Sequence, residues 1–220
     1  LWFGGYQDLF SLQENCLTAY SSKMHLDIRA IAEDNSGDLW IGTIQEGLYR
    51  LPRGQTRQLT KVPKYPVRDA RSLFVGPDGT LWVGSQQSGL FRRSVTSSED
   101  FVLSAGTLSD TIFSILNDHT SHLWMATGNG IIGVSTRTPI TDSAGAGPPL
   151  LWKHLSLAEG LGHRRCYSKG QPGIARTSDG RLWFPNVDHL AVLDPKKTFS
   201  WSAIHNVLVE SLQADGKELP

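Results

Sequence analysis

Arginine, carboxamide, carboxylate and aromatic side chains gather in short polar segments between the apolar runs of this 220-residue sequence. Carboxamides and carboxylates hydrogen-bond to hydroxyl groups, and aromatic rings stack on the faces of sugars. These segments therefore predict contacts with a small polar molecule or an oligosaccharide. Surface turns are polar in most proteins, so an ordinary solvated turn remains the alternative at each position. The candidate binding residues are Tyr6, Arg29, Gln45, Arg68, Asp69, Gln86, Gln87, Asp110, Asn129, Tyr167, Asn186 and His189.

Two pairs of acidic residues suggest an enzymatic alternative, namely Glu159 with Asp188 and Asp69 with Asp110. Paired carboxylates cleave glycosidic bonds, but their separation decides the chemistry and the sequence does not set it. The sequence contains no Gly-x-Ser-x-Gly motif, Walker loop or Cys–His signature. We therefore expect no catalytic residues in this chain. A free-standing lyase or glycan hydrolase is one alternative, and a protein-interaction scaffold is another.

A metal site is the next chemistry to consider. His119-x-x-His122 has two suitable ligands, but only Asp118 stands nearby as a third, so a solvated turn is the favoured interpretation. We expect no metal and no cofactor. Cys16 and Cys166 are far apart in the sequence, and we expect packed thiols rather than a disulfide.

The dipeptide Leu-Trp recurs five times, at positions 1, 39, 81, 123 and 182. A period near 40 residues is the signature of a repeat architecture. Within residues 28–51, three strand-like segments are separated by turn residues, and residues 58–62 offer a fourth strand. Short strands at this spacing predict an all-β fold of β-propeller blades, with about five four-stranded repeat units.

The repeated phrase also predicts how the strands pack. Leu39 and Trp40 are neighbours on one strand and must point to opposite faces of the sheet, so both faces need apolar cover from adjacent sheets. A column of small residues nine positions before the leucine of each of the four later pairs suits the crowded central axis. In a propeller, the starts of the innermost strands and the turns between second and third strands share one face. The candidate residues fall in these segments, except Tyr167, which lies in an insert before the last repeat unit. The small column is Ala30, Ser72, Ser114 and Gly173.

Composition narrows the classes of partner. The 21 basic and 21 acidic residues balance, and no Lys/Arg cluster stands out, so a nucleic acid or a membrane surface is not an expected partner. No apolar run is long enough to span a bilayer.

The repeated phrases resemble the two-component regulator propeller repeat. The resemblance rests on Gly-x-Leu-Trp-Ile-Gly-Thr at residues 37–43, on Gly-Leu-aromatic-Arg at residues 47–50 and 89–92, and on a closing unit at residues 179–195. Residues 207–217 are similar to the opening strand of the immunoglobulin-like domain that follows such propellers. Residues 1–200 are therefore assigned to the propeller, and residues 201–220 to that following domain or to a ring-closing strand.

The resemblance implies a periplasmic or extracellular sensor portion of a bacterial membrane protein, with a histidine kinase or diguanylate cyclase elsewhere in the parent. It also implies a membrane-anchored, dimeric parent that binds a small-molecule or oligosaccharide signal. The first Leu-Trp unit lacks its leading strand, so we expect the blades to belong to a larger propeller. A five-bladed ring sealed by residues 209–212 is the alternative.

Overall fold

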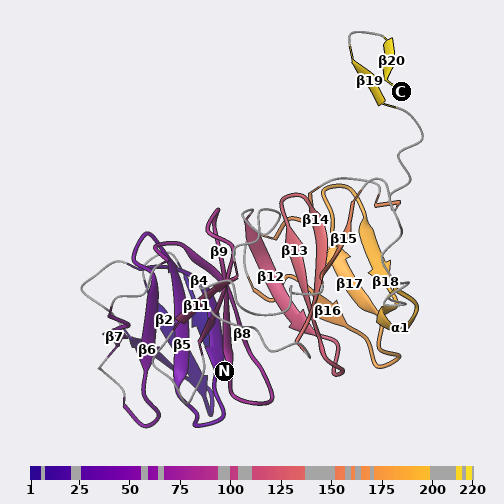
Figure 1. Ribbon diagram of the computed structural model, residues 1–220. Helices are drawn as coiled ribbons and strands as arrows, with labels where there is room; N and C mark the ends of the chain where they lie inside the picture. The colour runs from indigo at the N-terminus through magenta and orange to yellow at the C-terminus, as the bar shows by residue number, and fades with distance from the viewer. Residues whose placement is uncertain are drawn as a thin grey trace.

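The computed structural model describes residues 1–5, 8–20, 26–55, 59–63, 67–93, 100–103, 111–136, 152–156, 160–161, 165–168, 171–198, 212–214 and 217–219. These residues form five antiparallel sheets that follow one another in chain order, with a separate two-stranded hairpin near the C-terminus (Figure 1). In each of the five sheets, the strands that are neighbours in sequence are also hydrogen-bonded neighbours. The predicted all-β propeller architecture is confirmed.

The strands have the following bounds. The first sheet has β1 (Trp2–Gly4), β2 (Leu9–Gln13) and β3 (Cys16–Tyr20); the second has β4 (Asp27–Glu33), β5 (Leu39–Ile44), β6 (Leu48–Leu51) and β7 (Thr60–Lys61). The third has β8 (Ala70–Val75), β9 (Leu81–Ser85), β10 (Leu90–Arg93) and β11 (Asp100–Leu103); the fourth has β12 (Ile112–Asn117), β13 (His122–Thr127), β14 (Gly130–Ser135) and β15 (Trp152–Leu155). The fifth has β16 (Ala175–Arg176), β17 (Leu182–Pro185) and β18 (Leu190–Leu193), followed by the single turn α1 (Pro195–Thr198) and the hairpin β19 (Leu212–Ala214) and β20 (Lys217–Leu219).

Each complete sheet begins with an innermost strand and carries its Leu-Trp pair on the second strand. β5, β9, β13 and β17 hold this place in the second to fifth sheets. In the first sheet the pair lies at the start of β1, which is the first strand of its sheet. The described part of the first sheet therefore lacks the innermost strand, as the sequence predicted. The assignment of residues 201–220 stays a prediction, because most of them lie outside the described residues.

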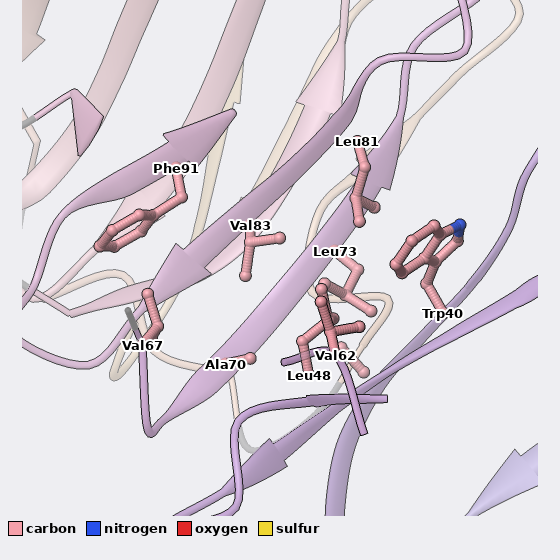
Figure 2. Close-up of a cluster of buried hydrophobic side chains, with 10 residues drawn as sticks. Trp40, Leu48, Val62, Val67, Ala70, Leu73, Leu81, Val83 and Phe91 are labelled. Atoms are coloured by element: carbon pink, nitrogen blue, oxygen red, sulfur yellow. The ribbon is translucent and has the colours of Figure 1, made fainter. Parts of the chain in front are cut away.

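In the second, third and fourth sheets, the leucine and the tryptophan of the pair face opposite neighbours, as predicted. Leu39 packs with Leu9 of the first sheet, whereas Trp40 packs with Leu73 and Leu81 of the third sheet (Figure 2). Trp82 in turn packs with Leu123 of the fourth sheet. The second, third and fourth sheets are thus covered on both faces, because neighbouring residues of one strand point to opposite sides.

The close approach of neighbouring sheets explains the glycine after the Leu-Trp phrase. A Cβ atom at Gly42 would lie 2.6 Å from the carbonyl oxygen of Ala70, on the innermost strand of the next sheet. At Gly84 it would lie 2.6 Å from Cγ2 of Ile112, at the equivalent place one sheet later. Most side chains are excluded there because backbone or buried atoms cannot move aside. The small column is also confirmed as buried at Ala30, Ser72 and Ser114.

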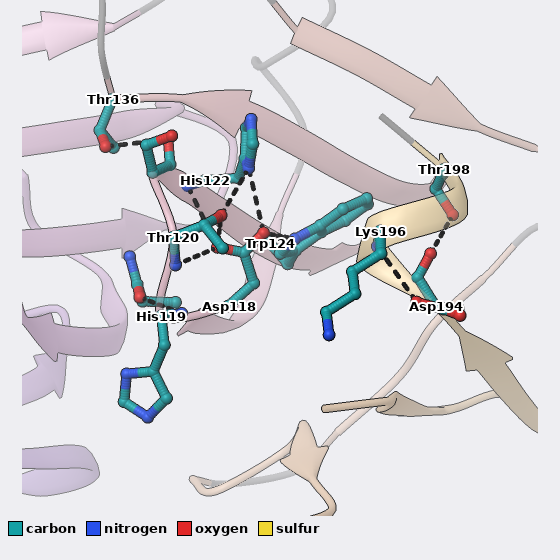
Figure 3. Close-up of polar contacts among 11 residues, drawn as sticks. Asp118, His119, Thr120, His122, Trp124, Thr136, Asp194, Lys196 and Thr198 are labelled. Atoms are coloured by element: carbon teal, nitrogen blue, oxygen red, sulfur yellow. Dashed lines mark hydrogen bonds and ion pairs between the residues drawn. The ribbon is translucent and has the colours of Figure 1, made fainter. Parts of the chain in front are cut away.

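In the second, fourth and fifth sheets, the turn before the second strand is hydrogen-bonded to the tryptophan of that strand. Nε1 of Trp40 donates to Asp34, Nε1 of Trp124 donates to Asp118, and Nε1 of Trp183 donates to Thr177. In the fourth sheet, Asp118 also accepts hydrogen bonds from Thr120 (Figure 3). We call the side of the molecule that carries these turns the far face.

The far-face turn of the fourth sheet contains the two histidines. Nδ1 of His122 lies 3.0 Å from the Asp118 carboxylate, while His119 is exposed. Within the described ranges, no three His, Cys, Asp or Glu side chains are grouped so that they could hold a metal ion.

The two cysteines differ from each other. Cys166 is buried and free, and burial raises the pKa of its thiol to about 11. Cys16 is exposed at the start of β3, so the prediction of a packed thiol was wrong at this position. The first four residues of β3 are all exposed, so neither face of the strand buries the thiol. Among the described residues, no helix has the length and hydropathy needed to cross a bilayer.

Candidate functional site

The starts of the innermost strands and the turns between second and third strands lie on one side of the molecule, here called the loop face. Backbone hydrogen bonds join them in successive sheets: Gly47 N–H donates to Arg68 O over 2.8 Å, and Gln86 N–H donates to Asp69 O over 3.1 Å. Gly128 N–H donates to Thr111 O over 3.2 Å in the same manner. These bonds confirm that the two sets of predicted loop segments share a face.

A β-bulge recurs at the start of three innermost strands. The register shifts between Ile28 and Ala30 in β4, between Ala70 and Ser72 in β8, and between Ile112 and Ser114 in β12. The extra residues are Arg29, Arg71 and Phe113. A bulge bends the strand and redirects a side chain, and bulges are frequent beside functional sites. This repeated feature places three large side chains around the loop face.

Four of the loop-face side chains are in contact, and we call them the inner-rim cluster: Arg71, Gln86, Phe113 and Tyr167. Nε of Arg71 donates to Oε1 of Gln86 over 2.8 Å, and its guanidinium carbon lies 5.7 Å from the centre of the Phe113 ring. The Phe113 and Tyr167 rings meet edge to face with centres 5.1 Å apart. Tyr167 is 40% exposed. The cluster thus offers a cation, a carboxamide and an aromatic ring side by side.

Gln171 fastens the segment that carries Tyr167. Its Oε1 accepts the N–H of Leu73 at 3.0 Å, and its Nε2 donates to the carbonyl of Leu73 at 2.6 Å. One carboxamide therefore satisfies both backbone groups of Leu73 on the innermost strand β8. Close by in sequence, Gly173 N–H donates to Oγ of Ser114 over 3.2 Å. Gln171 thus anchors the approach to the fifth sheet against the third.

Arg29 occupies a different environment from the inner-rim cluster. It forms an ion pair with Asp27 at 2.8 Å and lines a pocket of about 600 Å³ together with β1, β4 and Gln171. The pocket runs along β1, on the side where the other sheets carry an innermost strand. This pocket lies apart from the inner-rim cluster, and Arg29 is the one predicted binding residue among its lining residues.

Three further candidates lie together at the junction of the second and third sheets. Oδ1 of Asp69 accepts the backbone N–H of Gln45 over 2.7 Å. Gln45 and Arg68 line a pocket of about 280 Å³. In the same pocket, a hydrogen bond 2.8 Å long between Lys61 and Glu46 lowers the pKa of Glu46 and raises that of Lys61. Lys61 and Glu46 neutralise each other, so the positive charge of Arg68 remains on the pocket lining.

The remaining described candidates sit apart from the inner-rim cluster. Gln87 and Asn129 are exposed in their turns, and the carbonyl oxygen of Asn129 lies 2.8 Å from Nε2 of His154. Nδ1 of His189 lies 2.6 Å from the Asp188 carboxylate, and the carbonyl oxygen of His189 accepts the N–H of Asn186. Tyr6 and Asp110, like Glu159 of the hypothetical carboxylate pair, lie outside the described residues.

Sequence reasoning named Gln86 and Tyr167 as candidates but missed Arg71, Phe113 and Gln171. A signal for two of them was present, because Arg71 and Phe113 follow Arg29 at intervals of one repeat. The bulge itself could not be predicted from the sequence, because Arg29, Arg71 and Phe113 all fall within apolar segments that read as regular strands.

Comparison with known proteins agrees with this fold. Residues 22–45 match the model of the two-component regulator propeller family. The chain carries this propeller repeat, as the resemblance predicted. A search of curated proteins gives no match.

Several solved structures share the architecture. The extracellular domain of a hybrid two-component system from B. thetaiotaomicron matches 100% of this chain and 32% of its own, with a TM-score of 0.66 and 14% identity. A second such domain from the same organism matches 87% of this chain and 25% of its own, with a TM-score of 0.67 and 17% identity. Virginiamycin B lyase from Staphylococcus aureus matches 89% of this chain and 63% of its own, with a TM-score of 0.64 and 15% identity.

The chain therefore spans about a quarter to a third of the length of the extracellular domains that it resembles. At these levels of identity the comparisons show a shared propeller fold, which sensors and lyases both use.

Proposed function

We propose that this chain is a signal-sensing, ligand-binding part of an extracytoplasmic regulator and that the inner-rim cluster binds the ligand. The repeat match and the two extracellular domains of hybrid two-component systems support the class of protein. The parent is then a membrane-anchored dimer whose kinase or cyclase output lies outside these residues. The contact of Arg71 with Gln86 and Phe113 is the observation that supports the position of the site.

The chemistry of the cluster suits a hydroxylated ligand such as an oligosaccharide. A guanidinium and a carboxamide together supply donors and an acceptor for hydroxyl groups, while an aromatic ring supplies a stacking surface. Tyr167 is partly exposed next to the buried Phe113, so its ring is accessible and held in place. Because the cluster joins the third, fourth and fifth sheets, a ligand there would link the positions of three blades.

A panel of oligosaccharides tests this proposal by thermal shift, with calorimetry on each hit. We expect the binding oligosaccharide to lose at least tenfold in affinity on Arg71→Ala and on Tyr167→Ala. Arg181→Ala is the matched control, because Arg181 is exposed on the far face and pairs with Asp179. Equal affinity in all three variants would move the site elsewhere, and no hit from a broad panel would count against the sugar class.

A second candidate function is catalysis, favoured by the His189–Asp188 pair on the loop face. A carboxylate 2.6 Å from Nδ1 orients the imidazole, as in sites where histidine acts as a general base. Turnover of a glycan or streptogramin panel, abolished by His189→Ala, would support an enzyme. Binding without turnover would support the sensor.

A further inference from the structure

The second and third sheets begin with the same Asp-x-Arg segment, which runs from Asp27 to Arg29 and from Asp69 to Arg71. In both sheets the arginine is the extra residue of the β-bulge. In the second sheet the aspartate neutralises it, because Nη2 of Arg29 lies 2.8 Å from Oδ2 of Asp27. The shared segment therefore predicts the same ion pair in the third sheet.

The third sheet uses the two charged side chains differently. Oδ1 of Asp69 accepts the backbone N–H of Gln45 over 2.7 Å, on a turn of the preceding sheet. Nε of Arg71 donates instead to Oε1 of Gln86 over 2.8 Å. The counterpart of Gln86 one repeat earlier is Ile44, whose side chain has no acceptor. This difference explains why the two arginines have different partners.

Arg71 consequently has no ion-pair partner among the described residues, and its side chain is partly exposed. Nε–H is the guanidinium donor that a described residue accepts, and the N–H groups of Nη1 and Nη2 remain available. These two nitrogens form a planar fork whose spacing matches the two oxygens of a carboxylate. The third sheet thus presents a positive charge where the second sheet has a neutralised pair.

An aromatic wall lies beside this charge. The guanidinium carbon of Arg71 is 5.7 Å from the centre of the Phe113 ring, and the Tyr167 ring meets Phe113 from another direction with 5.1 Å between the centres. Because both groups contact the same ring, one sugar residue can approach the guanidinium and the partly exposed Tyr167 together. The Nε2 group of Gln86 adds a donor for a hydroxyl oxygen.

We propose that the inner-rim cluster selects acidic sugars. The carboxylate of a uronic acid accepts hydrogen bonds from the two Nη groups of Arg71, and the sugar ring lies against Tyr167. This inference rests on the proposed function and names the class of its ligand. A neutral sugar leaves the guanidinium charge without a counter-charge, so the cluster distinguishes sugars by their charge.

Pairs of oligosaccharides that differ only in charge test the proposal. Each uronic-acid oligosaccharide of a panel is titrated into the ¹⁵N-labelled chain beside its neutral, carboxyl-reduced counterpart. The Nε–H resonance of Arg71, identified by its loss in Arg71→Gln, reports on the site. We expect an acidic member to shift this resonance saturably and to bind about tenfold more tightly than its neutral counterpart, with a smaller difference at high salt.

The outcomes separate this proposal from the proposed function. Neutral members that shift the Arg71 resonance with equal affinity would overturn the selection of acidic sugars and leave the proposed function standing. An acidic member that binds without shifting the resonance would place its site elsewhere and overturn the proposal. No binding by any member of the panel would count against both.

Two variants test the roles of the separated charges. Calorimetry should show acidic binding about tenfold weaker in Arg71→Gln. Asp69→Asn keeps an oxygen for the Gln45 N–H but removes a negative charge, so it should strengthen acidic binding. Arg181→Gln, on an exposed far-face turn, is the control and should change neither.

Unaltered acidic binding in Arg71→Gln would overturn the proposal. If that variant did not fold, Asp69→Asn would decide, because unchanged or weaker acidic binding there would show that the charge beside Arg71 does not govern the ligand.

Discussion

Two loop-face glutamines hold a backbone conformation that most residues avoid. Gln45 has φ 70° and Gln87 has φ 67°, one repeat apart. A non-glycine residue in the left-handed region of backbone conformations costs about 1–3 kcal/mol of strain energy, and such strain is found most often at functional sites. The recurrence of glutamine where glycine would fit more easily therefore favours a role for the side chain on the loop face.

Replacement of Gln87 by glycine tests this strain. We expect Gln87→Gly to raise the free energy of unfolding by about 0.5–1 kcal/mol, because glycine adopts positive φ without steric cost. Ser88→Gly is the control, since Ser88 is not among the described residues with positive φ and glycine should destabilise it. Urea denaturation of both variants gives the comparison. Similar losses in the two would show that the Gln87 backbone is not strained.

Asp118 is the residue whose charge matters most to the far-face turn of the fourth sheet. Its side chain is only 1% exposed, and burial opposes its charge, but hydrogen bonds from Thr120 and Trp124 outweigh this and hold its pKa below the usual value. A carboxyl with a lowered pKa in the folded state stabilises the fold above its unfolded pKa, near 3.9, and this contribution is lost as the pH falls through the folded pKa.

Substitution of Asp118 should therefore have a pH-dependent effect. We expect Asp118→Asn to lower the free energy of unfolding at pH 7 by about 1.5–3 kcal/mol, the range for hydrogen bonds to charged groups. At pH 3 the gap between the variant and the unaltered chain should narrow, because protonation weakens the bonds in the unaltered chain. Urea titrations at the two pH values check this, and a gap of constant size would argue against a charged Asp118.

At the scale of the elements, the sequence predicted the blades because packing dictates the repeated phrase. The second strand of a blade faces a neighbouring sheet on each side, so the leucine and the tryptophan of its Leu-Trp pair must both be large and apolar. Leu39 is 3% exposed and Trp124 is fully buried, in agreement with that argument. The exception is the fifth sheet, where Trp183 is only half-buried although its sequence context is the same. Burial at this position therefore depends on a following sheet, which the phrase itself does not encode.

This difference predicts unequal costs for one substitution. Trp124→Ala should lower the free energy of unfolding by about 3–5 kcal/mol, because a large side chain leaves a cavity. Trp183→Ala should cost about 1 kcal/mol, since solvent already reaches that ring. Denaturant titrations of the two variants give the comparison under matched conditions. A loss below about 1 kcal/mol for Trp124→Ala would contradict its role as a core residue.

At the scale of the whole molecule, the sequence predicted which turns share a face better than which side chains meet there. Strand order alone sets which turns share a face, so Gln86 was placed on the loop face without knowledge of its contacts, whereas Tyr167 was named for its ring alone. The bulge that brings Arg71 and Phe113 together follows from how the innermost strands bend around the axis. The carboxamide of Gln171 reaches Leu73 across 98 residues of sequence. No local pattern encodes such contacts, because each depends on the relative positions of separate sheets.

The outer faces of the first and fifth sheets carry large apolar side chains that are exposed to solvent. Leu12 and Leu17 are cross-strand partners in the first sheet, with 37% and 62% of their surfaces exposed. Leu190 and Val192 lie on one side of β18, with 62% and 46% exposed. Exposed apolar patches of this kind mark contact surfaces, and a contact between two different faces of identical chains does not close after one pair.

We therefore expect the isolated chain to self-associate through these two faces. Sedimentation velocity should show larger species as the concentration rises, and the double change Leu190→Ser and Val192→Thr should suppress them without lowering the thermal midpoint, because neither side chain contributes to the core. Arg181→Ser, on the far-face turn of the same sheet, should leave association unchanged. A chain that stays monomeric over the whole range would mean that neighbouring polar side chains already shield these residues. Association that resists the double change would place the contact on another surface.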